Sequence, residues 1–439
     1  MSSFFPSLST VETVAKGAFA TAAGLGTLSA GLLYYGQSFL IYPSAYVKIG
    51  EDDGVPTKPE SYGLHHELVD LKTKDGQTLK CYLLLQKRNL PKPKKFNSIP
   101  SIHIDAIEGA VESGYSRMTD EELVSQRPTV IMFHGNGGNA GHRIPLGMMF
   151  QQVMRCNVLG VEYRGYGDST GSPSEAGFAI DAVTALEFVR GDSRLRNTPV
   201  ILYGQSIGGA VAIDLASRFP GEISGIALEN TFLSLRLLVP HVLPLLGRFK
   251  WLCHQTWESA GKVIGMPNVV SQTRIEDRLA GLVREKEDMQ VKEAFKERWE
   301  KANEVLDSAA SQVLNGGGGS LTRVGKGLGK EYKGIPRETN VLLLSGGSDT
   351  LVPPQHMEFL HQIFKARAHT RRTLGLQPLS QEGKSEDVDE ERSRLSRFYQ
   401  GTHNDTTMQY GYWVKVGDFV AEVGKEWREQ QRLGEQSGS

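Results

Sequence analysis

The sequence predicts an α/β fold in which a mostly parallel central sheet of about eight strands carries helices on both faces. From "TVIMFHGNGG" onward, short apolar runs alternate with helix-like segments, and each run ends in glycine or small polar residues. Near-continuous Val, Ile and Leu runs of this kind indicate parallel strands that are buried on both faces. In such sheets the functional groups gather just beyond the carboxyl ends of the strands.

The strands are expected in a simple order along the chain. "LHHELVDLKT" and "TLKCYLLLQ" alternate polar and apolar residues on either side of "KDGQ", which favours an antiparallel hairpin. The strands that follow are expected in "TVIMFHGNGG", "NVLGVEYRGYGD", "PVILYGQSIGG", "SGIALENTF", "NVLLLSGGSD" and "TRRTLGL".

One catalytic domain, residues 60–430, is expected to fill most of the chain of 439 residues, because a chain of this length can bury one large core. Surface insertions are predicted at about 88–127, 266–333 and 377–397, where the sequence is charged, rich in Pro and Lys, or linker-like. The apolar stretch Leu233 to Trp257 fits two interpretations equally well: a lid over a substrate pocket, or a helix pair that covers the sheet.

The first 45 residues are predicted to be a membrane anchor. No charged residue occurs from Gly17 to Val47, which is long enough to span roughly 30 Å of hydrocarbon as a helix, with tyrosines at the interface. A cleaved signal peptide and a buried N-terminal helix are the alternatives. The anchor predicts a single-pass, membrane-associated protein of the endoplasmic reticulum, another endomembrane or the plasma membrane.

Composition excludes several classes of partner. The chain has 49 Lys and Arg against 50 Asp and Glu, so no overall charge would recruit nucleic acid. Cys81, Cys156 and Cys253 have no metal-ligand spacing and cannot all pair with one another. His134 and His142 lack an acidic or cysteine partner, so we expect no metal site and no cofactor.

Ser206 is the predicted nucleophile. "GQSIG" matches the pattern G-x-S-x-G between the expected strand "TPVILY" and the helix-like "AVAIDLASRF". A serine at a sharp turn from strand to helix must adopt strained backbone angles, and flanking glycines remove the clashes that would forbid the turn. The motif alone occurs by chance in many proteins, so the remaining groups decide the assignment.

A serine hydroxyl needs a base to take its proton and an acid to orient that base. His403 follows the last expected strand, and Asp349 follows the strand before it. The chain order serine, acid, histidine is the order of an α/β hydrolase. Taken singly, His403 could be an exposed loop residue and Asp349 a turn or capping residue. Glu229, at the end of "SGIALE", is a second candidate for the acid and ranks below Asp349.

The reaction also needs donors for the developing oxyanion. The backbone N–H of Ile207 is one candidate, and the N–H of Asn136 in "HGNGGN" is the other. His134 is expected to shape this loop through side-chain hydrogen bonds rather than act as the base. Arg164 and Asp168 are expected to tie down the loop that begins at "YRGYGD".

Together these motifs resemble the membrane-anchored serine hydrolases of the bud emergence protein 46 type, in the α/β-hydrolase superfamily. The matching pieces are "FLIYPS", "FHGNGGNAGHR", "YRGYGDSTGSPSE", "YGQSIGGAVA", "ENTFLSLR", "GGSDTLVPPQHM" and "GTHNDT". The resemblance implies that Ser206, Asp349 and His403 form the triad, that the N-terminus is an anchor, and that an ester, thioester or amide is hydrolysed. The insertion ending in "GGGGS" and the acidic loop before His403 depart from the family pattern.

The sequence therefore predicts a membrane-anchored serine hydrolase of the esterase, lipase or thioesterase type. The apolar stretch after "ENTF" and the anchor favour a lipid-like acyl substrate: a lysophospholipid, an acylglycerol or a palmitoylated protein. The alternative is a catalytically silent membrane scaffold that keeps the fold and acts through the helical pattern from Ile275 to Leu314, since a fold alone does not establish a function. The oligomeric state does not follow from the sequence.

Overall fold

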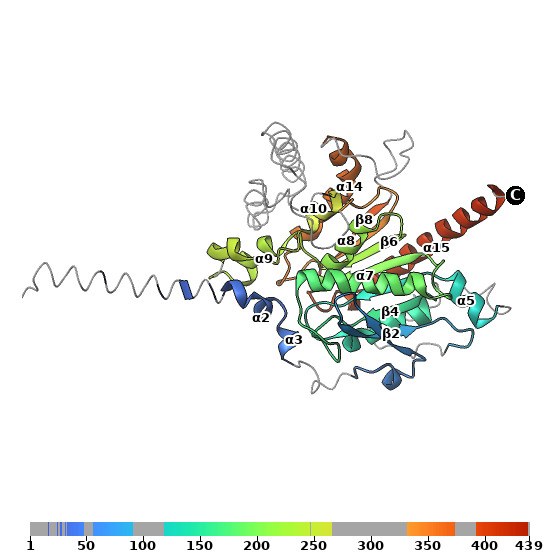
Figure 1. The fold of residues 1–439 in the computed structure, drawn as a ribbon. Helices are drawn as coiled ribbons and strands as arrows, with labels where there is room; N and C mark the ends of the chain where they lie inside the picture. Colours follow the sequence, from blue (N-terminus) through green and yellow to red (C-terminus); the bar gives the residue numbers. More distant parts are fainter. Residues whose placement is uncertain are drawn as a thin grey trace, which may run out of the picture.

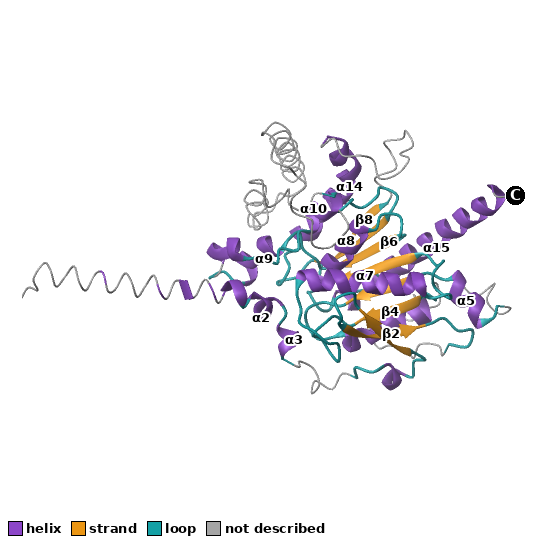
Figure 2. Cartoon of the chain, in the orientation of Figure 1, coloured by secondary structure: helices purple, strands orange, loops and turns teal. Residues whose placement is uncertain are grey.

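The computed structural model describes residues 33–47, 56–90, 118–245, 247–265, 332–373 and 392–437, together with Lys16, Gly24, Thr27, Leu28 and Gly31. Its centre is a twisted sheet with helices on both faces (Figures 1 and 2). The strands are β1 (Glu67–Lys72), β2 (Thr78–Leu84), β3 (Thr129–Phe133), β4 (Asn157–Val161), β5 (Val200–Gln205), β6 (Gly225–Glu229), β7 (Asn340–Gly346) and β8 (Ser393–Phe398).

The strands lie in the order β1-β2-β4-β3-β5-β6-β7-β8. The contacts β1 with β2 and β2 with β4 are antiparallel, and every other pair in the sheet is parallel. The predicted hairpin and the mostly parallel sheet of eight strands are therefore confirmed.

Helices pack on the two faces of the sheet. The main helices are α2 (Gln37–Ile41), α3 (Pro43–Tyr46), α5 (Asp120–Gln126), α6 (Ile144–Met148), α7 (Glu175–Gly191), α8 (Ile207–Arg218), α9 (Leu235–Val242), α10 (Ser259–Ile264), α14 (Gln355–Thr373) and α15 (Tyr412–Ser437). Short helical turns are η1 (Pro59–Tyr62), η3 (Ala140–Arg143), η4 (Met149–Val153), η5 (Gly247–Leu252) and η8 (Thr406–Met408). Side chains of α7, α8, α10 and α14 share one core with one face of the strands, and those of α6, η4 and α15 share the other.

Two sequence expectations near the C-terminus are wrong. "TRRTLGL" does not begin a strand, because its first residues continue α14, in which the buried Leu360, Phe364 and Ala368 recur every four residues. The final strand is β8, which overlaps the end of the insertion predicted at 377–397. It lies at the edge of the sheet and has only its first and last residues buried, so it lacks a continuous apolar run.

The insertion predicted at 88–127 also ends too late. Thr119 and Glu122 form a reciprocal capping box at the start of α5, and Leu123 and Val124 are buried. The Arg127 guanidinium donates to the carbonyl oxygen of Arg155 at 2.7 Å. Residues 119–127 therefore belong to the folded domain. Residues 91–117, 266–331 and 374–391 lie outside the described part, as does the helical pattern from Ile275 to Leu314.

Most of residues 1–32, on which the anchor prediction rests, also lie outside the described residues. Within the described part of the chain, no helix combines the length and the apolar character needed to cross a bilayer. The segment 33–47 packs against the catalytic domain, and Tyr42 is completely buried. Tyr42 is one of the tyrosines of the uncharged run that were expected at a membrane interface, and for Tyr42 this expectation is wrong, because its ring packs on Phe178 at a centroid distance of 5.1 Å.

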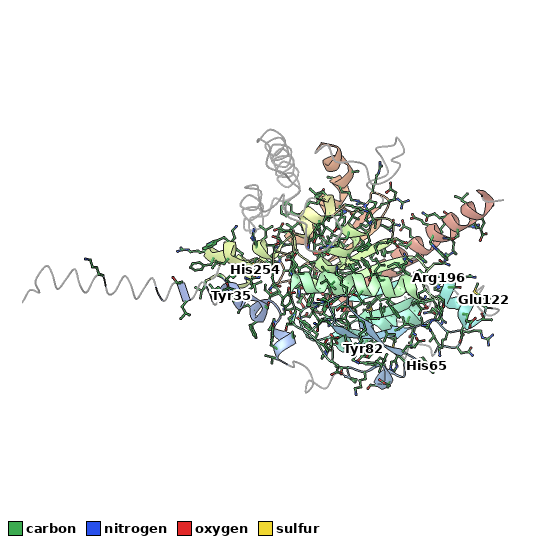
Figure 3. The ribbon with its side chains drawn as sticks, in the orientation of Figure 1. Tyr35, His65, Tyr82, Glu122, Arg196 and His254 are labelled. Carbon is green, nitrogen blue, oxygen red and sulfur yellow. The ribbon has the colours of Figure 1, made fainter. Side chains whose placement is uncertain are left out.

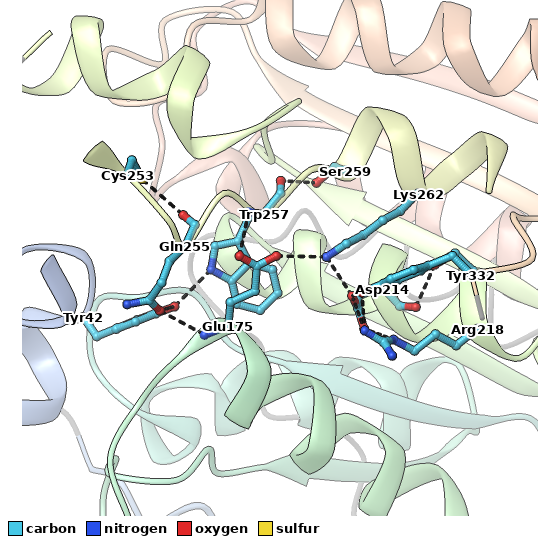
Figure 4. A network of polar contacts seen from close by, with 11 residues as sticks. Tyr42, Glu175, Asp214, Arg218, Cys253, Gln255, Trp257, Ser259, Lys262 and Tyr332 are labelled. Carbon is cyan, nitrogen blue, oxygen red and sulfur yellow. Dashed lines mark hydrogen bonds and ion pairs between the residues drawn. The ribbon is translucent and has the colours of Figure 1, made fainter. Parts of the chain in front are cut away.

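A buried polar network connects this N-terminal segment with α8 (Figure 4). Trp257 Nε1 donates to the Tyr42 hydroxyl at 3.0 Å, and the Trp257 backbone N–H donates to Glu175 Oε2 at 3.0 Å. Lys262 Nζ lies 3.1 Å from Glu175 Oε1 and 2.7 Å from Asp214 Oδ1. Burial alone would raise the pKa of Asp214, but the charges of Lys262 and Arg218 outweigh it and hold the pKa at about 2.

Candidate active site

Ser206 occupies the sharp turn between β5 and α8, as the motif predicts. Its φ of 54° and ψ of −119° are strained for a residue with a Cβ atom. The turn is held by backbone contacts, since the Ser206 N–H donates to the Glu229 carbonyl oxygen at 2.8 Å. Thr231 Oγ1 donates to the Ser206 carbonyl oxygen at 2.7 Å. These contacts fix the serine at the carboxyl end of the central strand.

The glycines on either side of Ser206 are required by close packing. A Cβ atom on Gly204 would lie 2.3 Å from the Gly208 carbonyl oxygen, and one on Gly208 would lie 2.1 Å from the Phe133 carbonyl oxygen. Both contacts are with backbone atoms, which cannot move aside. The pattern G-x-S-x-G is therefore a steric requirement of this strand, turn and helix.

Asp349 and His403 are brought together from positions 54 residues apart. His403 Nδ1 lies 2.8 Å from Asp349 Oδ2. The other oxygen, Oδ1, accepts the backbone N–H groups of Leu351 and Val352, each at 2.9 Å. The carboxylate is buried and has fixed partners for both oxygens, so it can hold the imidazole in one orientation.

Two amides hold the His403 loop beside the serine turn. The Gln205 side chain, next to Ser206, donates from Nε2 to the His403 carbonyl oxygen at 3.2 Å. Asn230 Nδ2 donates to the same carbonyl oxygen at 3.2 Å, and Asn230 Oδ1 accepts the Gly346 N–H at 2.8 Å. Asn230 thus ties the ends of β6 and β7 to the loop that carries His403.

No motif of the sequence pointed to a role for Gln205 or Asn230. Each stands directly beside a residue that was singled out, Ser206 and Glu229 respectively, at the carboxyl end of a strand. An amide in that position has both donors and an acceptor to offer neighbouring loops. This position could have marked them as candidates, although it does not say which loops they contact.

Glu229, the second candidate for the acid, has other partners. The hydroxyls of Tyr203 and Tyr412 each donate to Glu229 Oε2 at 2.5 Å, and Gln205 Nε2 donates to Oε1 at 3.0 Å. Burial raises the pKa of Glu229, and the two tyrosine hydrogen bonds only partly offset this effect. Asp349, and not Glu229, contacts the His403 ring in the structure.

The loop after β3 lies beside the serine. A Cβ atom on Gly135 would lie 3.6 Å from Ser206 Cβ, in ordinary van der Waals contact. The Asn136 side chain is held on both sides: Tyr166 Oη donates to its Oδ1 at 2.6 Å, and its Nδ2 donates to the Ile41 carbonyl oxygen at 2.5 Å. The N-terminal segment therefore helps to position the loop whose N–H is the candidate oxyanion donor.

The other polar residues of these loops have structural contacts. His134 Nδ1 lies 2.7 Å from the Gly135 carbonyl oxygen, and its Nε2 lies 3.1 Å from Glu162 Oε1, consistent with a role in shaping the loop. Arg164 pairs with Asp181 at 2.8 Å and ties its loop down as expected. Asp168 is exposed, contrary to the role expected for it. Among the described residues, no group of three His, Cys, Asp or Glu side chains could hold a metal ion.

Comparison with known proteins agrees with the observed fold. Residues 128–374 match the family described as alpha/beta hydrolase fold. Protein bem46 of Schizosaccharomyces pombe is 37% identical over 240 residues, which cover 54% of this chain and 67% of that protein. The uncharacterized membrane protein YNL320W of Saccharomyces cerevisiae is 27% identical over 400 residues, 91% of this chain and 94% of that protein.

A third relative has an activity in its name. The lysophosphatidylserine lipase ABHD12 of Xenopus tropicalis is 30% identical over 175 residues, which cover 38% of this chain and 44% of that protein. The resemblance to the bud emergence protein 46 type, expected from the motifs, is therefore confirmed.

Proposed function

Because the chain belongs to the alpha/beta hydrolase fold family, we propose that it is a serine hydrolase that cleaves acyl ester or thioester bonds. Ser206 is the nucleophile, His403 the general base and Asp349 the acid that orients the imidazole. The observation that carries the proposal is the 2.8 Å contact between His403 Nδ1 and Asp349 Oδ2 at the end of the sheet where Ser206 forms its strained turn.

The proposed reaction has two halves. Ser206 Oγ attacks the acyl carbonyl carbon while His403 Nε2 takes the hydroxyl proton, and the same proton then passes to the departing alcohol or thiol. Water next attacks the acyl-enzyme, gives its proton to His403 and releases the carboxylic acid, and the proton returns to Ser206. The N–H groups of Ile207 and Asn136 stabilise the oxyanion in both halves, each by about 3 to 4 kcal/mol.

A lipid-like acyl substrate is the favoured class. One relative carries the name of a lysophosphatidylserine lipase. The stretch Leu233 to Trp257 also divides into two parts: Leu235, Leu237 and Leu238 are buried on α9, and apolar side chains of the following turn are exposed. The segment thus packs into the core with one part and offers an apolar surface with the other.

The proposed enzyme is tethered to a membrane by its N-terminal segment, at an endomembrane or the plasma membrane. The part of the uncharged run that lies before residue 33 supports the tether, and a relative that spans nearly the whole chain is named a membrane protein. This assignment concerns residues before 33, since the segment 33–47 packs on the catalytic domain.

A substrate series tests the proposed class. Purified full-length protein is expected to hydrolyse lysophospholipids, monoacylglycerols or a palmitoylated peptide with a kcat/KM that rises with acyl-chain length, because each buried CH₂ contributes about 0.8 kcal/mol. The three substrate types distinguish a lysophospholipase, an acylglycerol lipase and a thioesterase. A clear preference for short soluble esters over all three would contradict the lipid assignment and leave the serine mechanism intact.

A further inference from the structure

Exposed large apolar side chains gather at one end of the molecule. Among the described residues they lie on the N-terminal segment, on the turn after α9 and on the loops beyond β7 and β8, while Leu68 and Leu433 lie elsewhere. Leu245 and Tyr35 are the most exposed, at 91% and 83%, and Trp251 is 68% exposed. Single exposed apolar residues are normal in soluble proteins, but such a concentration marks a contact surface.

We call the set Tyr35, Phe39, Leu40, Val242, Leu243, Leu245, Phe249 and Trp251 the apolar rim. Its two halves come from distant parts of the chain and are joined by direct contacts. The rings of Tyr34 and His254 lie 4.6 Å apart, and Gln37 Oε1 accepts the backbone N–H of His254 at 3.1 Å. Figure 3 shows Tyr35 and His254 close together at the end of the molecule where the N-terminal segment emerges.

The rim also borders the candidate active site. His241 Nε2, at the end of α9, lies 2.8 Å from the Thr350 carbonyl oxygen. Thr350 directly follows Asp349, and the neighbouring Leu351 is itself 43% exposed. A surface that rests on the apolar rim would therefore lie next to the loop that carries Asp349.

The charged residues of the segment that carries α9 and η5 are of one sign. Between Glu229 and Glu258 the sequence contains no acidic residue, whereas it contains Arg236, Arg248 and Lys250. Arg248 is exposed on η5, next to Phe249. Aromatic and aliphatic side chains interleaved with basic ones fit the boundary between anionic head groups and acyl chains.

We propose that the apolar rim rests on a lipid bilayer, with Leu245, Phe249 and Trp251 inserted at the level of the head groups. The positive charge of the segment with α9 and η5 favours an anionic lipid surface over an apolar protein groove, and the N-terminal half of the rim belongs to the uncharged run that begins at Gly17. The contact extends the proposed membrane tether with a second, separate attachment and holds the mouth of the site at the surface where lipid-like substrates reside.

Depth-dependent quenching of Trp251 tests this proposal without using enzyme activity. Full-length protein is reconstituted into phosphatidylcholine vesicles containing phosphatidylserine, with bromine atoms at a shallow or a deep position on the acyl chains. The difference in emission between wild type and Trp251→Phe isolates Trp251 from the other four tryptophans. We expect this difference to lose intensity on brominated lipid, with greater loss for the shallow bromine.

The double variant Leu68→Trp, Trp251→Phe is the matched control. Leu68 is 67% exposed, but it lies on β1 at the edge of the sheet opposite β8. Its new indole is expected to keep its emission on brominated lipid. If the protein stays with the vesicles and Trp251 is not quenched, the rim does not touch the bilayer and the proposal is wrong. Protein that fails to associate with vesicles at all would also overturn the N-terminal tether, while leaving the serine mechanism untouched.

Discussion

Asp349→Asn is expected to lower kcat by about 10⁴-fold on any acyl ester that the protein hydrolyses, with little change in stability. The two carboxylate oxygens of Asp349 have different partners. Oδ1 accepts the N–H groups of Leu351 and Val352, and the amide oxygen of asparagine can keep both bonds. The turn after β7 is therefore expected to survive the substitution.

The amide nitrogen introduced by Asp349→Asn would face His403. An asparagine Nδ2 donates a hydrogen bond where Asp349 Oδ2 accepts one from His403 Nδ1. The imidazole would then carry its proton on Nε2, and this tautomer cannot take the proton of Ser206. Steady-state kinetics on the best ester, together with a urea unfolding curve, separate the loss of the base from any loss of the fold.

Glu229→Gln is the control for this assignment. It removes the carboxylate that Tyr203 and Tyr412 contact and leaves the His403–Asp349 pair in place. Suppose that Glu229→Gln lowers kcat by about 10⁴-fold while Asp349→Asn keeps the wild-type rate. Glu229 would then be the acid, and the assignment of Asp349 would be wrong.

Tyr42→Ala has the second large expected effect, a loss of about 3 to 5 kcal/mol in the free energy of unfolding. The ring is completely buried against Phe178. Its hydroxyl donates to Gln255 Oε1 at 2.8 Å and accepts from Trp257 Nε1 at 3.0 Å. Truncation would leave a cavity and a buried indole N–H without its partner, and both are costly.

Tyr35→Ala is the matched comparison, because Tyr35 lies in the same uncharged run and is 83% exposed. Its free energy of unfolding, measured in urea, is expected to change by no more than about 0.5 kcal/mol, the range usual for surface substitutions. Equal, small effects of the two substitutions would mean that residues 33–47 are not packed on the catalytic domain. The neighbouring Ile41 accepts a hydrogen bond from the Asn136 side chain, so Tyr42→Ala is also expected to loosen the loop after β3 that carries Asn136.

Sequence patterns identified the strands that are buried on both faces, because continuous Val, Ile and Leu runs leave little choice of structure. They failed at β8, an edge strand whose middle residues are not buried and are mostly polar. They also failed at Tyr42, since an uncharged run looks the same whether it faces lipid or a protein core. The side-chain contacts of Asn230 and Gln205 depend on which loops the fold brings together, and no local pattern contains that information.

The residues of the candidate site were easier to predict from the sequence than the residues that hold them in place. Gly204 and Gly208 could be recognised in the sequence, because a clash with backbone atoms excludes every other residue at these two positions. Asp349 and His403 could be chosen because parallel strands end at one edge of the sheet, so residues far apart in the chain must meet there. Asp168 was singled out by the same loop pattern as Arg164, yet it is exposed, because composition alone does not say which polar residue of a loop turns inward.

Covalent labelling by a fluorophosphonate tests the central claim, a serine activated by its own base, most directly. The full-length protein in detergent is treated with the probe, digested and analysed by mass spectrometry, beside Ser206→Ala and His403→Ala. The account predicts an adduct on Ser206 in the wild type, none in Ser206→Ala and a strongly reduced rate of labelling in His403→Ala. A folded wild-type protein that gains no adduct, or one that labels at the same rate without His403, would contradict it.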